Sequence, residues 1–436
     1  MTPEQLNEQF KEFLATKKDV TPSPIPGLVM YKDGRIKASS LVNIEKLLEH
    51  DFKDSIKFND FTQDIQNTAL IRLDSYTFYI GKLDDDFLNQ LRSYFDSHYG
   101  VLFASDLIFT AISNVAHRNK FNPVENYFNE AYRLWDHHDR FSTLFHDFLG
   151  VDKSKLVTEI TKMWMTAAIA KTFEDEFQFD YVLDFIGDQG VGKTTFLKRL
   201  GFGYTTDKVM DFISKDYYSM MIKSLILNDD EMKATKKASF EELKSFVTMT
   251  DLEFRPPYGR TVNVYPKHFV IARTTNEKTY LKDKTGDRRF IPLHTHADQA
   301  KFHPSEITVD TTEYIKQTWG QAMDNYQKYT EGLYEFKLDS DLEEELERLR
   351  KTVMYIDETE EQLDEALERS KSNFITTQDI ARNMGEFDLL KNDRLAKKIK
   401  YYMDNKENWI YKRKKIDGVI KRGYQRVNGV NLGTLI

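Results

Sequence analysis

A glycine-rich loop carries the clearest chemical signal in this sequence. The pattern G-x-x-x-x-G-K-[ST] is matched by Gly187, Asp188, Gln189, Gly190, Val191, Gly192, Lys193 and Thr194. Glycines leave room for backbone N–H groups to surround phosphate oxygens. We expect Lys193 to reach the β- and γ-phosphates and Thr194 to bind Mg²⁺, while the helix that opens at Thr195 adds the positive end of its dipole. The loop therefore predicts a nucleotide site that uses Mg²⁺.

Three consecutive acids and one asparagine are candidates to complete this site. Asp229, Asp230 and Glu231 follow an apolar segment that lies about one βα unit after the loop. We expect Glu231 to orient the attacking water and either Asp229 or Asp230 to hold the metal; the alternative is an ordinary acidic loop. Asn276 follows a third apolar segment, and at the end of a strand beside the loop it could touch the γ-phosphate or the water.

Two arginines follow a predicted turn ten residues further on. Arg288 and Arg289 stand in the sequence TGDRRF. They could be surface charges. Beside an otherwise complete nucleotide site, they are better explained as cations that reach across a subunit boundary to the γ-phosphate of a neighbouring copy, where such a group stabilises transition-state charge.

The elements around the loop indicate an α/β fold. An apolar strand at 181–186 precedes the loop and a helical segment at 195–200 follows it, which is the context that a functional phosphate-binding loop requires. The α/β alternation continues to about residue 293, and we assign the nucleotide-binding domain to 151–338. The predicted fold class is α/β, a P-loop NTPase.

Length and composition set limits on the rest of the chain. The 436 residues suggest two or three domains, and the absence of cysteine excludes disulfides, thiol nucleophiles and cysteine-based metal sites. The net charge of −8 means that any attraction for nucleic acid must be local. No apolar run approaches the length of a membrane span, and the first residues do not resemble a signal peptide. We expect a cytoplasmic protein with no membrane partner.

The N-terminal third shows no nucleotide motif. A capping pattern and apolar residues at helical spacing predict a helix at 1–17, and three prolines predict a linker at 18–27. The helix could dock on a replication partner or fold back on its own domain. Residues 28–150 mix short strands and helices, and we assign them to a mixed α+β accessory domain.

The charge reverses along the C-terminal part. Residues 339–370 are acidic and helical in pattern, which predicts a solvated connector, whereas residues 391–426 hold 13 Lys and Arg against four acids. Helical patterns followed by two extended runs around an Asp-Gly pair predict a small winged helix-turn-helix domain at 371–436. We expect it to bind duplex or origin DNA through a basic wing formed by Lys412, Arg413, Lys414 and Lys415. The alternative is a basic packing domain without a DNA role.

The order of these motifs resembles a superfamily 3 helicase and, more closely, the virulence-associated protein E family of bacteriophages and pathogenicity islands, with poxvirus-type primase-helicases as distant relatives. The resemblance spans about residues 36–293. It is carried by the segments FNDF, FNPVENYFNEAYRLWDHHDR, FIGDQGVGKTTFLKRL, LKSFVTMTDLEFRPPYGR and TTNEKTYLKDKTGDRRFIPL. It implies an ATP-driven ring translocase of the AAA+/superfamily 3 type, usually a hexamer, that acts on DNA during replication of a mobile element in a bacterial host.

The resemblance also implies a β-hairpin that faces the channel of the ring. Two predicted strands flank a PPYG turn, and basic groups with one aromatic could grip single-stranded DNA and stack on a base. The matching residues include Lys244, Arg255, Tyr258, Arg260 and Lys267. An ordinary surface hairpin is the alternative. Asn228 stands where the family often has glutamate, and no clear primase carboxylates are present.

These observations predict an ATP-dependent DNA helicase and replication initiator that works as a homo-hexameric ring. The main alternative is an ATP-driven oligomeric switch or loader that binds DNA without unwinding it. A DNA-binding scaffold with a vestigial loop is a third possibility, but the intact Lys193, Thr194, acids and arginines argue against it.

Overall fold

The computed structural model describes residues 25–255, 261–281, 287–354, 358–370, 372–389, 392–404, 406, 408–416 and 418–427. The helix predicted at 1–17 and most of the linker predicted at 18–27 lie outside these residues, as do Tyr258 and Arg260. The chain divides into two compact units, the first comprising residues up to 277 together with 288–348, and the second comprising 278–287 with the residues from 349 onward.

A five-stranded parallel sheet forms the centre of the first unit. Its order is β13-β7-β12-β9-β8, and every neighbouring pair is parallel. The strands are β7 (Val182–Ile186), β8 (Thr205–Thr206), β9 (Ile226–Asp229), β12 (Val270–Thr275) and β13 (Phe290–His294). All residues of β7, β9 and β12 are buried, as expected for a parallel sheet that is covered on both faces. The predicted α/β class is confirmed, and the structure adds that the sheet is parallel.

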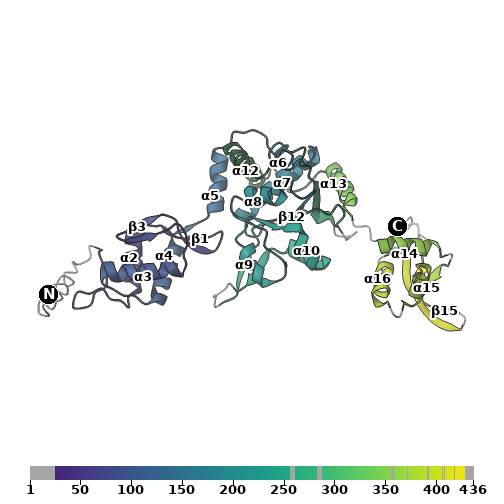
Figure 1. Ribbon diagram of the computed structural model, residues 1–436, viewed down its shortest axis with the longest axis horizontal. Coiled ribbons are helices and arrows are strands. Elements are labelled where there is room, and N and C mark those ends of the chain that lie inside the picture. Colours follow the sequence, from purple (N-terminus) through teal and green to yellow (C-terminus); the bar gives the residue numbers. More distant parts are fainter. Residues whose placement is uncertain are drawn as a thin grey trace, which may run out of the picture. The chain divides into compact units, whose positions relative to one another are not determined.

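Helices cover both faces of this sheet (Figure 1). On one face, Trp164 of α7 donates its indole N–H to the Ile271 carbonyl, and Trp319 of α12 donates to the Leu200 carbonyl at the end of α8. On the other face, α10 is held by the end of strand β9. The helices and short turns of this region are α5 (Pro123–Arg133), α6 (Leu144–Leu149), α7 (Lys155–Phe173), α8 (Lys193–Leu200), η1 (Lys215–Tyr217), α9 (Tyr218–Met221), η2 (Asp230–Met232), α10 (Lys233–Lys237), α11 (Phe240–Thr248), η3 (Asp287–Arg289), α12 (Val309–Thr330) and α13 (Ser340–Thr352).

A buried ion pair joins two central strands. The Arg273 side chain on β12 makes two hydrogen bonds, of 2.7 and 2.5 Å, to the Asp184 carboxylate on β7. Arg273 and Asp184 are 1% and 0% exposed, and the guanidinium also lies 4.2 Å from the centre of the Phe290 ring on β13. Because Arg273 pairs in register with both Asp184 and Asp229, it ties together neighbouring strands across the sheet.

Residues 25–121 form a small α+β body with its own apolar core. Strand β6 pairs parallel with β1 at the edge of a four-stranded sheet of order β5-β2-β1-β6. The elements are α2 (Leu41–Phe52), β1 (Ile56–Asn59), β2 (Asp64–Asn67), β3 (Ile71–Leu73), β4 (Tyr76–Phe78), β5 (Gly81–Lys82), α3 (Asp85–Tyr99), α4 (Ser105–Arg118) and β6 (Lys120–Phe121). The core of this body runs from Ile25 to Ala116, whereas α5 and α6 pack into the core of the parallel sheet. The accessory domain predicted at 28–150 therefore ends earlier than expected.

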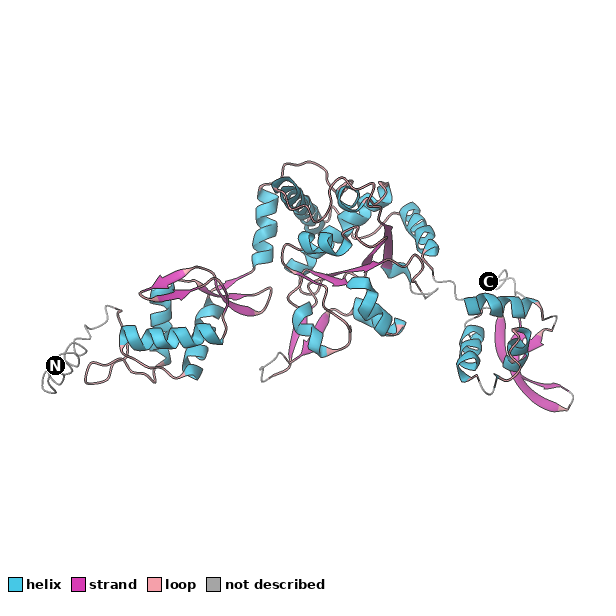
Figure 2. Cartoon of the chain, viewed as in Figure 1, coloured by secondary structure: helices cyan, strands magenta, loops and turns pink. Residues whose placement is uncertain are grey.

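The second unit contains helices and a three-stranded antiparallel sheet of order β14-β16-β15, drawn in magenta in Figure 2. Its elements are α14 (Glu358–Glu368), β14 (Phe374–Ile375), α15 (Thr377–Asn383), α16 (Asp393–Asp404), β15 (Trp409–Ile416) and β16 (Val419–Arg426). The hairpin predicted near Gly418 is present. Leu363 and Leu367 of α14 belong to the core of this unit, whereas Leu342 and Leu346 of α13 belong to the parallel-sheet core. The segment expected as a solvated connector at 339–370 is thus divided between two cores.

Candidate nucleotide site

The glycine-rich loop and three strand ends surround one cavity of about 280 Å³. The loop follows β7, Asp230 follows β9, and Asn276 follows β12. Because parallel strands end at the same edge of a sheet, these residues converge there, at the position where α/β sheets bind ligands. The cavity also receives Thr194, Thr195 and Glu231.

The geometry of the loop depends on glycine. Gly190 and Gly192 both have φ of +92°, a conformation that other residues rarely adopt. A Cβ atom on Gly192 would also lie within 2.8 Å of the Pro304 ring. The loop thus has the open backbone that close approach of a phosphate requires.

Lys193 lies in the cavity with its ammonium group held by the loop. Its Nζ donates hydrogen bonds to the carbonyls of Gly187 and Asp188, at 2.6 and 2.9 Å, and to Oδ1 of Asn276 at 3.1 Å. The side chain is 7% exposed, and burial lowers the Lys193 pKa. A buried cation surrounded by three neutral acceptors favours the arrival of an anion.

Thr194 and Asp230 meet directly. The Thr194 hydroxyl donates to Oδ1 of Asp230 at 2.5 Å, and the Thr274 hydroxyl donates to the same oxygen at 3.1 Å. Burial would raise the Asp230 pKa, but the bonds from Thr194 and Thr274 and the charge of Lys233 outweigh it and hold the pKa below its ordinary value. An ionised carboxylate beside a hydroxyl is an oxygen pair that fits Mg²⁺.

Asp229, the other predicted metal ligand, is used elsewhere. Its two carboxylate oxygens accept the N–H groups of Ala234 and Thr235, at 2.8 and 2.9 Å, and so cap the start of α10. The residue is 0% exposed and does not line the cavity. Of the two alternatives predicted from the sequence, Asp230 contacts Thr194, whereas Asp229 is buried outside the cavity. Within the described part of the chain, no cluster of three or more His, Asp or Glu residues is arranged to hold a metal.

Glu231 is presented by a strained turn. Glu231 and Met232 have φ of 55° and 53°, which is unusual for consecutive residues other than glycine. The Glu231 N–H donates to the Thr274 hydroxyl, and its side chain is 62% exposed at the cavity. The Lys233 ammonium lies between the two acids, 3.4 Å from Oδ2 of Asp230 and 3.5 Å from Oε2 of Glu231.

A residue missed by the sequence analysis, His303, also lines this cavity. It stands in the segment between β13 and α12, more than a hundred residues after the loop in the chain. No local motif marks it, and only the chain path brings it to the loop.

Arg288 and Arg289 lie at the opposite edge of the sheet. They immediately precede β13, whose first residue Phe290 pairs with Val182, the first residue of β7, whereas the glycine-rich loop follows the last residue of β7. Four steps along a strand separate the two edges, about 13 Å. The two arginines line a separate cavity of about 550 Å³ with Phe179, Tyr181 and Phe336, among other residues. They therefore do not belong to the nucleotide cavity of their own chain.

The predicted DNA hairpin is present as β10 (Asp251–Phe254) and β11 (Asn263–Pro266), and Arg255 is exposed at the end of β10. Lys267 was predicted to contact DNA, and this prediction is wrong. Lys267 is 3% exposed and donates to the carbonyls of Phe246 and Val247 at the end of α11. Lys244 is mostly covered, since it pairs with Glu241 and lies over the Phe240 ring.

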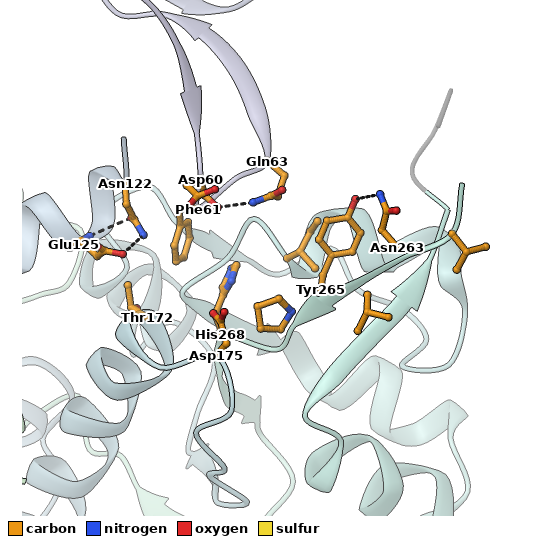
Figure 3. Close-up of a pocket in the computed structure, with 14 residues that line it drawn as sticks. Asp60, Phe61, Gln63, Asn122, Glu125, Thr172, Asp175, Asn263, Tyr265 and His268 are labelled. Carbon is orange, nitrogen blue, oxygen red and sulfur yellow. Dashed lines mark hydrogen bonds between the residues drawn. The ribbon is translucent and has the colours of Figure 1, made fainter. Parts of the chain in front are cut away.

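A third cavity, of about 650 Å³, opens at the base of this hairpin (Figure 3). In Figure 3 the Phe61 ring faces His268, with ring centres 4.3 Å apart. Burial lowers the His268 pKa to about 4. Asp60, Glu125 and Asp175 also line the cavity, so its charge opposes phosphate binding.

The basic wing is exposed over its length. Lys412, Arg413, Lys414 and Lys415 all lie on β15 at the surface. The strand register places Arg413 directly opposite Arg422 and Lys414 opposite Lys421. Like charges directly opposite each other repel, so this hairpin presents a surface that favours an anionic partner.

Comparisons with known proteins support one family. A search of curated proteins found no match. Two solved structures of the NrS-1 C-terminal region, both in the apo state, match with 12% and 13% identity and TM-scores of 0.46 and 0.44, covering 90% and 89% of this chain and all of each solved chain. In the described residues, no helix is long and apolar enough to cross a membrane. The family model of the virulence-associated protein E-like domain matches residues 129–355, just over half of the sequence and later in the chain than the resemblance predicted. The chain therefore belongs to the virulence-associated protein E-like family.

Proposed function

We propose that this chain is an ATP-dependent DNA helicase that serves the replication of a mobile genetic element in the bacterial cytoplasm. The observation that carries the proposal is the meeting of Lys193, Thr194, Asp230 and Asn276 in one cavity at the carboxyl edge of a parallel sheet. Strand β7, which leads into the glycine-rich loop, lies between β12 and β13 inside the sheet. This arrangement supports a P-loop NTPase of the AAA+/superfamily 3 type.

The residues of the cavity divide the chemistry among them. Lys193 would bind the transferring phosphate, and Asn276, already bonded to Lys193, would contact the same phosphate or the attacking water. Thr194 and Asp230 would hold Mg²⁺, which neutralises charge on the phosphates when bound. Glu231, on its strained turn, would orient the water.

The proposed enzyme is a head-to-tail ring of identical subunits, a homo-hexamer. The arginine pair lies at the amino edge of the sheet and the nucleotide cavity at the carboxyl edge. A heterologous interface that joins these two edges would complete each site with arginines from the next copy, and repeated rotation closes such contacts into a ring.

DNA would be bound in two places. The tip of the β10–β11 hairpin, with the exposed Arg255, would contact single-stranded DNA, and the basic wing would contact duplex or origin DNA. The helix-rich second unit with its hairpin supports a winged helix-turn-helix assignment.

A second function is favoured by one observation. The exposed positions on the described strands of the β10–β11 hairpin include Asp251 and Glu253, which would repel a phosphate backbone. An ATP-driven switch or loader, which assembles on DNA through the basic wing without pulling on a strand, would accommodate this charge.

A forked-duplex unwinding assay separates these functions. The helicase proposal expects ATP-dependent strand displacement by the wild-type chain and none by Lys193→Ala. DNA-stimulated ATP hydrolysis without displacement would favour the switch. Hydrolysis equal in the wild type and Lys193→Ala would refute both.

A further inference from the structure

We propose that His303 is a phosphate-contacting residue of the nucleotide cavity, donating a hydrogen bond from Nε2 to the bound nucleotide. The inference rests on the proposed function of the cavity and adds a residue that lies outside the glycine-rich loop. His303 lines the same cavity as Lys193, Thr194 and Asp230. It is exposed to solvent, so its ring can meet a ligand that enters from outside.

The segment that carries His303 is built onto the loop. Just after β13, the Thr295 N–H donates to the Ile186 carbonyl at 2.7 Å, at the point where β7 gives way to the loop. Further on, Pro304 packs against Gly192 so closely that any side chain there would collide with its ring. The segment therefore contacts both ends of the loop, and His303 directly precedes the proline that packs against Gly192.

Arg199 of α8 fixes the far side of this segment. Its guanidinium donates to the carbonyls of Pro304 and Glu306, at 3.2 and 2.8 Å, and to the Thr311 hydroxyl at 2.7 Å. Since α8 begins at Lys193, one helix supports both the loop lysine and the histidine segment. The position of His303 is set before a ligand arrives, which reduces the entropy lost on binding.

Hydrogen bonds also determine which ring nitrogen can donate. The Ser305 N–H donates to Nδ1 of His303 at 3.3 Å, and the Ser305 hydroxyl lies 2.6 Å from the same nitrogen. A backbone N–H can only donate, so Nδ1 is the acceptor and the proton of the neutral ring is on Nε2. Nε2 is therefore the ring nitrogen that can donate to a ligand, and the anionic oxygens of a polyphosphate are the acceptors that such a donor suits.

The test compares nucleotide binding by five proteins: wild type, His303→Ala, His303→Gln, His138→Ala and Lys193→Ala. His138 is a matched control, because it is an exposed histidine on a loop away from the cavity. Binding is measured by displacement of a fluorescent ATP analogue with ATP and, separately, with tripolyphosphate, which has phosphates but no base or ribose. Circular dichroism checks that each variant is folded.

We expect His303→Ala to bind both ATP and tripolyphosphate about tenfold more weakly, since it loses one hydrogen bond to a charged partner. His303→Gln keeps a donor and should recover part of the loss, while His138→Ala should match the wild type.

Unchanged binding by His303→Ala would overturn the inference while leaving the proposed function intact. Weaker ATP binding with unchanged tripolyphosphate binding would also overturn it, because the ring would then contact the base or ribose. A wild type that binds no nucleotide, or a Lys193→Ala variant that binds and hydrolyses ATP normally, would refute the proposed function and the inference together.

Discussion

The separation of the arginine pair from the nucleotide cavity makes a quantitative prediction about mixed assemblies. Arg288 and Arg289 begin β13 at the amino edge, about 13 Å along the sheet from the glycine-rich loop of the same chain. They cannot reach their own cavity without unpairing β13 from β7. If they act at all in hydrolysis, they act on a neighbouring copy, and each site needs one chain with an intact loop and a second with intact arginines.

The perturbation combines two inactive proteins, Lys193→Ala and the double variant Arg288→Ala/Arg289→Ala. Each alone should hydrolyse ATP very slowly, the double variant by about 10³-fold or more if the arginines stabilise transition-state charge. After mixing and exchange of subunits, an interface is active only when the double variant supplies the loop and Lys193→Ala supplies the arginines. In a head-to-tail ring of any size, equal mixing makes about one interface in four complete.

The assay is steady-state ATP hydrolysis at constant total protein while the mixing ratio is varied. We expect about a quarter of wild-type activity when the two variants are present in equal amounts. The activity should fall symmetrically to zero as the mixture approaches either pure variant. Subunit exchange is verified with differently labelled chains. Mixed assemblies without recovered activity at any ratio would refute the trans arrangement, and a double variant with full activity on its own would show that the arginines have no part in hydrolysis.

The other predictions concern the loop lysine, the buried ion pair and the basic wing. Lys193→Ala should abolish the proposed ATP hydrolysis while circular dichroism shows an unchanged fold, because the variant removes from the cavity the cation that would meet the transferring phosphate. Asp184→Asn should lower the free energy of unfolding by about 3–5 kcal/mol in denaturant titrations, since it leaves the Arg273 charge buried without its carboxylate; the exposed Asp298→Asn should change it little, and an equal change in both would contradict this account. Replacing the four basic residues of the wing by alanine should weaken duplex binding and reduce the log–log salt slope by roughly one for each phosphate that the wing no longer neutralises, with ATP hydrolysis retained. An unchanged slope would show that the wing does not touch the phosphate backbone.

The sequence was most informative where function depends on a short continuous pattern. The glycine-rich loop was predicted residue by residue, because its spacing, the preceding strand and the following helix are all local. That an acid after β9 lies near Thr194 could be predicted, since parallel strands end at the same edge of a sheet. Which of Asp229 and Asp230 does so could not be predicted. It depends on a turn with positive φ at Glu231 and on the capping of α10, and neither is encoded by neighbouring residue types.

Charged residues caused the main errors of prediction. Lys267 was expected to contact DNA because the family resemblance placed it at the channel hairpin, yet it is buried and donates to the carbonyls at the end of α11. The ion pair of Arg273 with Asp184 was not predicted, because in the sequence each residue is a single charge within an apolar segment. Only the strand register places the two side by side. His303 could not be found at all, since only the path of the chain after β13 brings it to the loop.

The like-charge pairs of the basic wing have a consequence for its own folding. Arg413 opposes Arg422 and Lys414 opposes Lys421, so the outer half of the hairpin repels itself in dilute salt. Added salt screens this repulsion and also weakens attraction to a polyanion. Raising the ionic strength should therefore make the free wing more ordered and lower its affinity for DNA. A bound phosphate backbone neutralises the same charges. Amide hydrogens of the β15–β16 ladder should therefore exchange more slowly in the complex than in the free protein, and the free wing should gain protection as salt rises.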